Sequence, residues 1–241
     1  MIPIADNFES QQKPIVTLFL IALTVAVFLG ELKLEVGGIL GEVLQGWGVV
    51  PGKLAEVASE AFLKLNPAAG IILVVMVVRS LIGSIFLHGS FAQILGNMLF
   101  LWVFGRRLED VLGRGKFFLF YIICGVMVGI LQIFAEPSLN VPLVGANGAV
   151  AGVLGGYFLC FPRAKIESIL PLIVLFVPVE VPVVCYLFWW FIQQWFYGIG
   201  SLAVEGGVNG GGLAYWLHGA GLIFGAGLVW GGGKLKIFRK F

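Results

Sequence analysis

The sequence predicts an all-α protein that crosses a membrane several times. Hydrophobic residues make up 59% of the 241 residues and charged residues only 12%, whereas a soluble domain carries about 25% charged residues. The mean hydropathy is +1.02. Apolar runs of about 20 residues, the length that crosses the hydrocarbon core of a bilayer, recur along the chain. These observations indicate a polytopic bundle of transmembrane helices.

The chain divides into one membrane domain and two short tails. Residues 1–13 are expected to form a polar N-terminal tail, residues 14–231 the membrane domain, and residues 232–241 a basic C-terminal tail. Acidic residues precede the first apolar run and no convincing small-residue cleavage site follows it, which argues against a cleavable signal peptide. Six spans are expected, over residues 14–31, 88–104, 117–134, 143–161, 182–199 and 213–230.

Four further segments are assigned to connections. Residues 32–67 alternate polar and apolar residues, which predicts a long first loop with amphipathic, interfacial pieces. Residues 68–87 are apolar, but they contain Arg79 and run into the next span without a polar turn, so we interpret them as a membrane-edge extension of that loop. Residues 166–181 contain two prolines and two glutamates, which favours a connector over a seventh span. Residues 205–212 are glycine-rich and are predicted to form a flexible loop.

The distribution of charge predicts the orientation and excludes one class of partner. With six spans, eleven of the 15 basic residues fall on one side of the membrane, so the positive-inside rule predicts that both termini are cytoplasmic. A net charge of +2, spread over loops, disfavours nucleic-acid binding. The three cysteines lie in apolar runs and lack metal-type spacing. The small size favours a bacterial-type inner membrane.

The stretch from Val144 to Gly156 is predicted to be the central helix. Its small residues allow other backbones to approach closely, which is useful only inside a bundle. Its start carries one polar residue, Asn147, and a polar side chain inside a membrane marks a functional site by default. The expected partner is His218, in a second glycine-rich helix. The packing residues of these two helices are Gly145, Gly148, Gly221 and Gly225.

A third predicted helix adds two amide side chains. Gln93 and Asn97 are four residues apart and therefore share one helix face. Amide groups that donate hydrogen bonds beside a histidine and the start of a small-residue helix form the outline of an acyl-transfer site, with a base, a nucleophile position and an oxyanion hole.

The sequence resembles the rhomboid family of intramembrane serine proteases over nearly all of the chain after the first span. The resemblance implies a six-helix bundle with a water-filled cavity open to the outside, in which a Ser–His dyad cuts transmembrane segments of other proteins without a metal or cofactor. It rests on five motifs in this order: Phe86-Leu87-His88-Gly89-Ser90, residues 96–105 with Leu108-Glu109, Gly145-Ala146-Asn147-Gly148-Ala149, Phe161-Pro162-Arg163-Ala164-Lys165, and His218-Gly219-Ala220-Gly221 with Gly225.

The sequence departs from the family pattern at two site positions. Asn147 stands at the nucleophile position, where the family has serine, and Gln93 stands where the family has an oxyanion-hole histidine. His218 matches the general base and Asn97 matches the oxyanion-hole asparagine. Arg79 matches the second residue of a Trp-Arg pair whose tryptophan is absent.

Asn147 is the more serious departure. Gln93 still offers an N–H group, and losing one oxyanion donor costs about 3–4 kcal/mol. An amide, in contrast, gives no covalent acyl-enzyme, because that route needs a hydroxyl or thiol. His88 is interpreted as a structural residue that ties the first loop to the bundle, and Asn97 as either an oxyanion donor or a tether between helices. The substitute nucleophiles Ser84, Ser90 and Ser138 receive no support from spacing.

Three functional classes remain open. The first is an inactive rhomboid-like protein that binds transmembrane segments of client proteins without cutting them. The second is an active intramembrane endopeptidase that uses another nucleophile, or whose Asn147 has replaced a native serine. The third is a channel or scaffold. The aromatic fifth span, over residues 182–199, and the loop over residues 205–212 are the expected gate and cap. The aromatic residues of that span are also typical of a lipid-facing, interfacial belt, and this alternative stays open.

Overall fold

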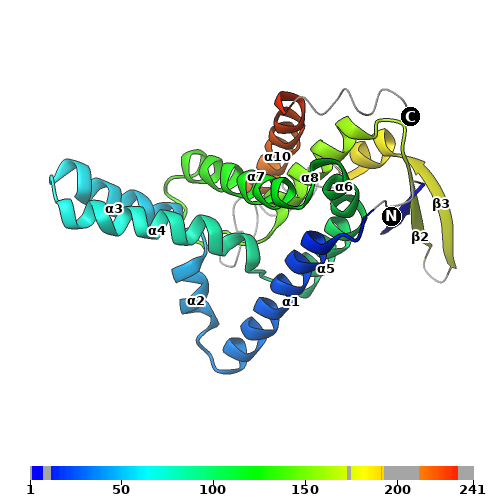
Figure 1. The fold of residues 1–241 in the computed structure, drawn as a ribbon. Coiled ribbons are helices and arrows are strands. Elements are labelled where there is room, and N and C mark those ends of the chain that lie inside the picture. Colours follow the sequence, from blue (N-terminus) through cyan, green and yellow to red (C-terminus); the bar gives the residue numbers. More distant parts are fainter. Residues whose placement is uncertain (1, 8–11, 173–174, 191, 193–211, 233–241) are drawn as a thin grey trace.

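The structure is a computed structural model that describes residues 2–7, 12–172, 175–190, 192 and 212–232. Most of it is helical, as the sequence predicts, and a small antiparallel sheet lies at one side of the bundle (Figure 1). The helices are α1 (Ile15–Val36), α2 (Leu40–Trp47), α3 (Pro51–Leu63), α4 (Pro67–Phe86), α5 (Phe91–Phe100), the π-helix η1 (Leu101–Gly105), α6 (Arg106–Leu112), α7 (Arg114–Ala135), α8 (Asn147–Cys160) and α10 (Gly212–Gly231).

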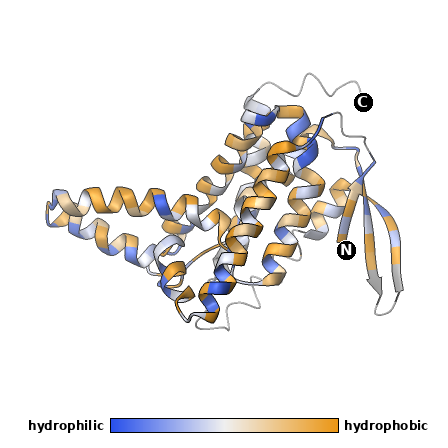
Figure 2. Ribbon diagram, turned by 60° about the horizontal axis from the view of Figure 1, so that its bottom comes forward, coloured by the Kyte–Doolittle hydropathy of each residue, from blue (hydrophilic) through white to orange (hydrophobic). Residues whose placement is uncertain are grey.

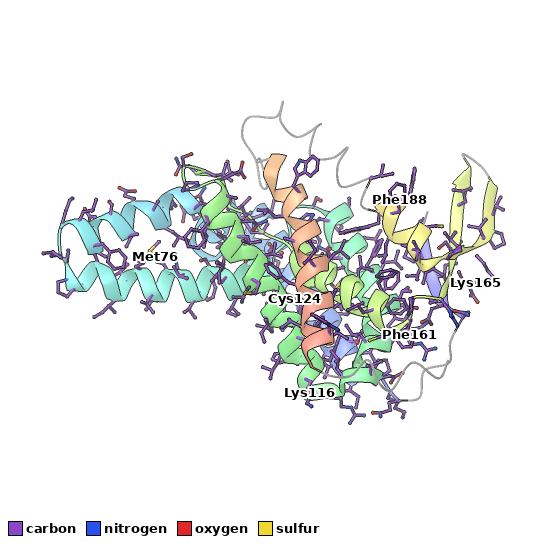
Figure 3. The ribbon with its side chains drawn as sticks, turned by 90° about the horizontal axis from the view of Figure 1, so that it is seen from above. Met76, Lys116, Cys124, Phe161, Lys165 and Phe188 are labelled. Carbon is purple, nitrogen blue, oxygen red and sulfur yellow. The ribbon has the colours of Figure 1, made fainter. Side chains whose placement is uncertain are left out.

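The core of the bundle forms around α8. Eleven of its 14 residues are buried, whereas large apolar side chains of α1, α4 and α7 are exposed. Figure 2 shows that most residues along these long helices are hydrophobic. Helices that are apolar on every side are typical of a bilayer environment, where the outer surface contacts lipid. Figure 3 shows Cys124 of α7 in the middle of the bundle, and its Sγ lies against Gly152 of α8.

Helices α5, η1 and α6 follow one another without a break, and the first two cover most of the predicted span over residues 88–104. Helix α6 is hydrogen-bonded to the start of α1. The Glu109 carboxylate accepts hydrogen bonds from Val16 N at 3.0 Å, from Thr17 N at 2.8 Å and from Thr17 Oγ1 at 2.8 Å. The first N–H groups of a helix lack partners within it, so a buried carboxylate from α6 fixes α1 to the bundle.

Helices α3 and α4 form a hairpin that extends away from the bundle (Figures 1 and 2). Met76 lies between the two helices of this hairpin (Figure 3). Helix α4 covers most of residues 68–87, which the sequence assigns to an extension of the first loop. By length and composition it is one of three described helices that could cross a membrane, with α1 and α7.

The sheet consists of β1 (Ile2–Asp6), β2 (Lys165–Leu172) and β3 (Leu175–Pro182) in that order. Residues 2–6 of the predicted tail therefore form a strand, and most of the predicted connector over residues 166–181 belongs to the antiparallel strands β2 and β3. Ile2 pairs with Ile169, and Lys165 pairs with Pro182. The prolines are compatible with strands in a small sheet, where edge positions tolerate a missing N–H group.

Part of the predicted fifth span follows the sheet. Residues 183–190 are helical, whereas residues 193–199 and most of the predicted cap over residues 205–212 lie outside the described residues. Tyr186 and Trp190 are buried, and Phe188 and Trp189 are exposed. The ring of Tyr186 lies 6.0 Å from that of Phe104 in η1, so this end of the fifth span packs into the core with one side and faces outward with the other.

Asp6 joins the sheet to the helical bundle. Its carboxylate is 3.1 Å from Arg107 Nε and 3.6 Å from an Arg106 nitrogen, and it accepts a hydrogen bond of 2.9 Å from the Tyr157 hydroxyl. Asp6 is only 6% exposed and Arg107 only 4%. A buried charge requires such partners, so this cluster fixes β1 against α6 and the C-terminal half of α8.

We predict that Asp6→Ala destabilises the protein by about 3–5 kcal/mol, because it removes the closer of the two carboxylates that pair with the buried Arg107, the other being Asp110 at 3.7 Å. The matched control is Glu180→Ala. That carboxylate pairs with Lys165 at 3.4 Å, but both side chains are more than half exposed, and an exposed pair contributes about 0–1 kcal/mol. Equilibrium unfolding in detergent micelles measures both variants. Equal losses would show that the Asp6 cluster is not a structural link.

Candidate functional site

The candidate site is built on the contact between α8 and α10. A Cβ atom at Gly225 would collide with the backbone of Gly152, and one at Gly155 would collide with the backbone carbonyl of Leu222. A Cβ atom at Gly221 would lie 2.9 Å from both the Gly148 carbonyl oxygen and the Ala151 Cβ. The two helices therefore touch through their backbones, and glycine is the residue that permits this approach.

This packing fixes the relative direction of the two helices. Gly148 lies against Gly221, and Gly152, four residues later, lies against Gly225, so α8 and α10 run parallel. His218 is one turn before Gly221 on the same helix face, and Asn147 immediately precedes Gly148. The contact consequently brings Asn147 and His218 to the same end of the helix pair. His218 is 4% exposed, and Asn147 is partly exposed at the first position of α8.

Gln93 lies beside the loop that leads into α8. Its Nε2 donates to the Val144 carbonyl oxygen at 2.9 Å, and its Oε1 accepts from Gly89 N at 2.8 Å. Gly145 has a φ of +123°, and a Cβ atom there would contact the amide nitrogens of both Gln93 and Asn147. Gly145 is thus required both by its backbone conformation and by the two amides that flank it.

His88 lies closer to this site than the sequence indicates. Its Nδ1 is 3.1 Å from the Phe86 carbonyl oxygen, which can only accept, so Nδ1 carries the proton. Its Nε2 then accepts hydrogen bonds from Asn97 Nδ2 at 3.1 Å and from Ala146 N at 3.4 Å. The side-chain N–H of Asn97 and the backbone N–H just before Asn147 therefore point at a histidine of the same chain.

The backbone of this histidine is hydrogen-bonded to a side chain of α1. Both carboxylate oxygens of Glu31, at 3.1 and 3.2 Å, accept from the backbone N–H of His88, and Glu31 is 2% exposed. Sequence reasoning did not single out Glu31, although an acidic residue at the end of an apolar span is an expected site marker. It also missed Asp6 and Tyr157, whose pairing depends on contacts between distant segments.

Arg79 lies in α4, next to α2. Its guanidinium carbon is 5.5 Å from the centroid of the Trp47 ring, a cation–π geometry. A Cβ atom at Gly83 would contact the Trp47 backbone, so the two helices are in direct contact here. The tryptophan that the family places next to this arginine is absent from position 78, and a tryptophan from another helix contacts the arginine instead.

The three serines considered as substitute nucleophiles lie in different parts of the structure. The Ser84 carbonyl oxygen accepts from Gly145 N at 2.8 Å, but its buried hydroxyl donates to Leu81 O of the same helix at 3.2 Å. The Ser90 hydroxyl accepts from Gln93 N at 3.2 Å, which makes it the N-cap of α5. Ser138 lies in the exposed turn after α7.

Comparison with known proteins identifies the family of this chain. Residues 76–235, more than half of the chain, match the Rhomboid domain. A stretch of 91 residues is 38% identical to "Rhomboid protein 1, mitochondrial" of Saccharomyces cerevisiae and covers 36% of this chain and 26% of that protein. Stretches of 75 residues, 31% of this chain, are 35% identical to "RHOMBOID-like protein 5" of Arabidopsis thaliana and 36% identical to "Rhomboid protease GluP" of Bacillus subtilis, covering 24% and 14% of those proteins.

These matches define a class of integral membrane protein with apolar helices, and the chain belongs to the rhomboid family. The matched stretches span about a quarter or less of the three relatives' own lengths.

We predict that Gly225→Ala destabilises the protein by about 1–3 kcal/mol, because a methyl group there forces α10 away from the α8 backbone. Gly227 is the matched control, since nothing lies within 4 Å of a Cβ atom at that position. Alanine also has the higher helix propensity, so Gly227→Ala should leave stability unchanged or slightly raised. Denaturant titration of both variants in micelles makes the comparison. A neutral Gly225→Ala variant would contradict the close α8–α10 contact.

Proposed function

We propose that this protein binds transmembrane segments of client membrane proteins and does not cleave them. The observation that carries the proposal is the amide of Asn147 at the start of α8, on the end of the helix pair where His218 lies. Covalent catalysis at this position needs a hydroxyl or thiol that an imidazole can activate. An amide nitrogen is not such a nucleophile, so the arrangement keeps the base and the framework but lacks the attacking group.

The hydrogen bonds around Asn147 support the same reading. The Asn97 amide and the Ala146 N–H both point at His88 Nε2, and one Gln93 N–H is used by Val144 O. An oxyanion hole needs donors aimed at the position where negative charge develops. Here the donors are engaged within the protein, which suits a site that holds a segment without stabilising a tetrahedral intermediate. After loss of the nucleophile, the remaining rate enhancement is about 10³–10⁴-fold over the reaction in water, which is too little to cleave peptide bonds in a cell.

The proposal includes six spans and a first loop that lies at the membrane surface. Helix α4 is apolar, but it packs on α3, which carries exposed charged residues at positions 53, 56 and 60 and is followed by Lys64. If α4 crossed the bilayer, α3 would bring these charges into the hydrocarbon, at a cost of several kcal/mol. A hairpin along the membrane edge avoids that cost, which favours an interfacial position for α3 and α4.

The proposed orientation puts both termini in the cytoplasm, in a bacterial-type inner membrane. Arg106, Arg107 and Lys165 lie at the end of the bundle that carries β1, opposite to the end with Asn147, and basic residues gather on the cytoplasmic side. With 14 residues, α8 is about 21 Å long, shorter than the ~30 Å hydrocarbon core. Its first residue would therefore begin inside the membrane, below the outer surface, where client segments pass.

An active intramembrane endopeptidase is the second candidate. Its support is the similarity to "Rhomboid protease GluP", and it requires either another nucleophile or a native serine at position 147. The described structure offers little for the first route, because the Ser84 hydroxyl donates to its own helix and the Ser90 hydroxyl caps α5.

One reconstituted assay separates these functions. The protein is placed in liposomes with a transmembrane peptide that carries a photo-crosslinker, and both capture and cleavage are followed. The unmodified chain is expected to capture the peptide and leave it intact. Asn147→Ser combined with Gln93→His is expected to cleave it, because the substitutions supply a nucleophile beside His218 and a histidine donor.

The control is the same double variant with His218→Ala, which should capture the peptide but lose cleavage. Cleavage by the unmodified chain, or its labelling by a fluorophosphonate, would eliminate the inactive function. A folded double variant that stays inert would show that the proposed dyad is misplaced. Absence of capture by every variant would favour a channel or scaffold.

A further inference from the structure

A second site lies outside the Asn147–His218 region, in a cavity of about 830 Å³ between α1, α2 and α4. Each helix contributes one stripe of side chains. Helix α1 supplies residues 23, 27, 30, 31 and 34, helix α2 supplies residues 43 and 47, and α4 supplies residues between 74 and 86. Pockets of about 300–1,000 Å³ are typical of small-molecule sites, so this cavity is large enough for a ligand of that size.

The walls of this cavity are apolar and open to the surroundings. Val74, Val75 and Val78 of α4 line it and remain 57–63% exposed. In an integral membrane protein such a surface contacts lipid rather than water, and flexible hydrocarbon is the material that it can hold. The apolar walls of the cavity therefore indicate an acyl chain.

Two ionisable side chains on the wall decide which lipid is favoured. Glu31 is satisfied, because both of its oxygens accept from His88 N. Arg79 is different: its buried Nε has no hydrogen-bond partner among the described residues, and its guanidinium lies over the Trp47 ring. No ion pair joins Arg79 to Glu31 in the described part of the chain. A guanidinium that has no carboxylate partner can bind a phosphate oxygen through its terminal nitrogens, and such charge-assisted hydrogen bonds are strong.

We propose that this cavity binds an anionic phospholipid, with an acyl chain between α1 and α4 and the phosphate group accepting hydrogen bonds from Arg79. The lipid fills the space between the α3–α4 hairpin and the bundle, and it lies next to Glu31, which holds the backbone of His88. The inference does not depend on whether the protein cleaves its clients, because the cavity shares no residue with Asn147, His218, Gln93 or Asn97.

Native mass spectrometry of the full-length protein in mild detergent tests the proposal. The protein is incubated with equal amounts of phosphatidylglycerol and phosphatidylcholine that carry identical acyl chains, and the bound lipids are counted. The unmodified chain should retain phosphatidylglycerol in preference. Arg79→Gln should lower that preference about fivefold, since one cation near the membrane surface contributes about 1 kcal/mol to binding an anionic lipid.

Two variants control for charge and folding. Lys33→Gln removes an exposed cation near the same end of α1 that does not line the cavity, and it should leave the preference unchanged. Arg79→Lys keeps the charge and should keep most of the preference, which separates loss of binding from loss of structure. An Arg79→Gln variant that behaves like Lys33→Gln would overturn the role of Arg79.

A second pair of variants tests the acyl-chain position. Val75→Trp fills the cavity and should reduce retention of both lipids at least several-fold. Ile71→Trp places the same side chain on the exposed surface of α4 outside the cavity and should have no effect. Equal lipid retention by the two tryptophan variants would overturn the proposal. So would displacement of the lipid by a transmembrane peptide that crosslinks to position 78, because the cavity would then hold a client segment.

Discussion

The close parallel contact between α8 and α10 is the constraint on which the remaining structure depends. In a bilayer there is little hydrophobic driving force between helices, so association relies on van der Waals contact at short range. Gly152 and Gly225 provide that contact, and any larger side chain at either position would separate the backbones. The same contact determines which ends of the two helices meet, and therefore where a polar residue on one can face a histidine on the other.

Around that contact the polar groups satisfy one another inside the protein. His88 accepts from Asn97 and from the backbone before α8, while Gln93 connects the start of α5 to the same loop. At the opposite end Asp6 joins β1 to α6 and α8. In the function proposed above, this framework lacks the group that would perform the attack, and the capacity that remains is recognition of client segments.

The sequence predicted the parts of this arrangement that depend on local pattern. The small-residue runs identified α8 and α10, and the predicted spans over residues 117–134, 143–161 and 213–230 differ from the helices by a few residues at their ends. It failed where distant segments determine the structure. The strand over residues 2–6 forms because it pairs with β2 and because Asp6 finds Arg107 and Tyr157, which no local pattern reveals. Likewise, the aromatic partner of Arg79 comes from α2 and not from its sequence neighbour.

The most direct measurement is thiol crosslinking between α8 and α10 in a variant without the three native cysteines. Asn147→Cys with His218→Cys is compared with Asn147→Cys with Val229→Cys, which lies near Gly156 and about 16 Å further along α10. With a short bifunctional thiol reagent, the parallel register predicts an intramolecular crosslink for the 147–218 pair and none for the 147–229 pair. A crosslink only in the 147–229 pair would show that α8 and α10 run antiparallel, with Asn147 far from His218.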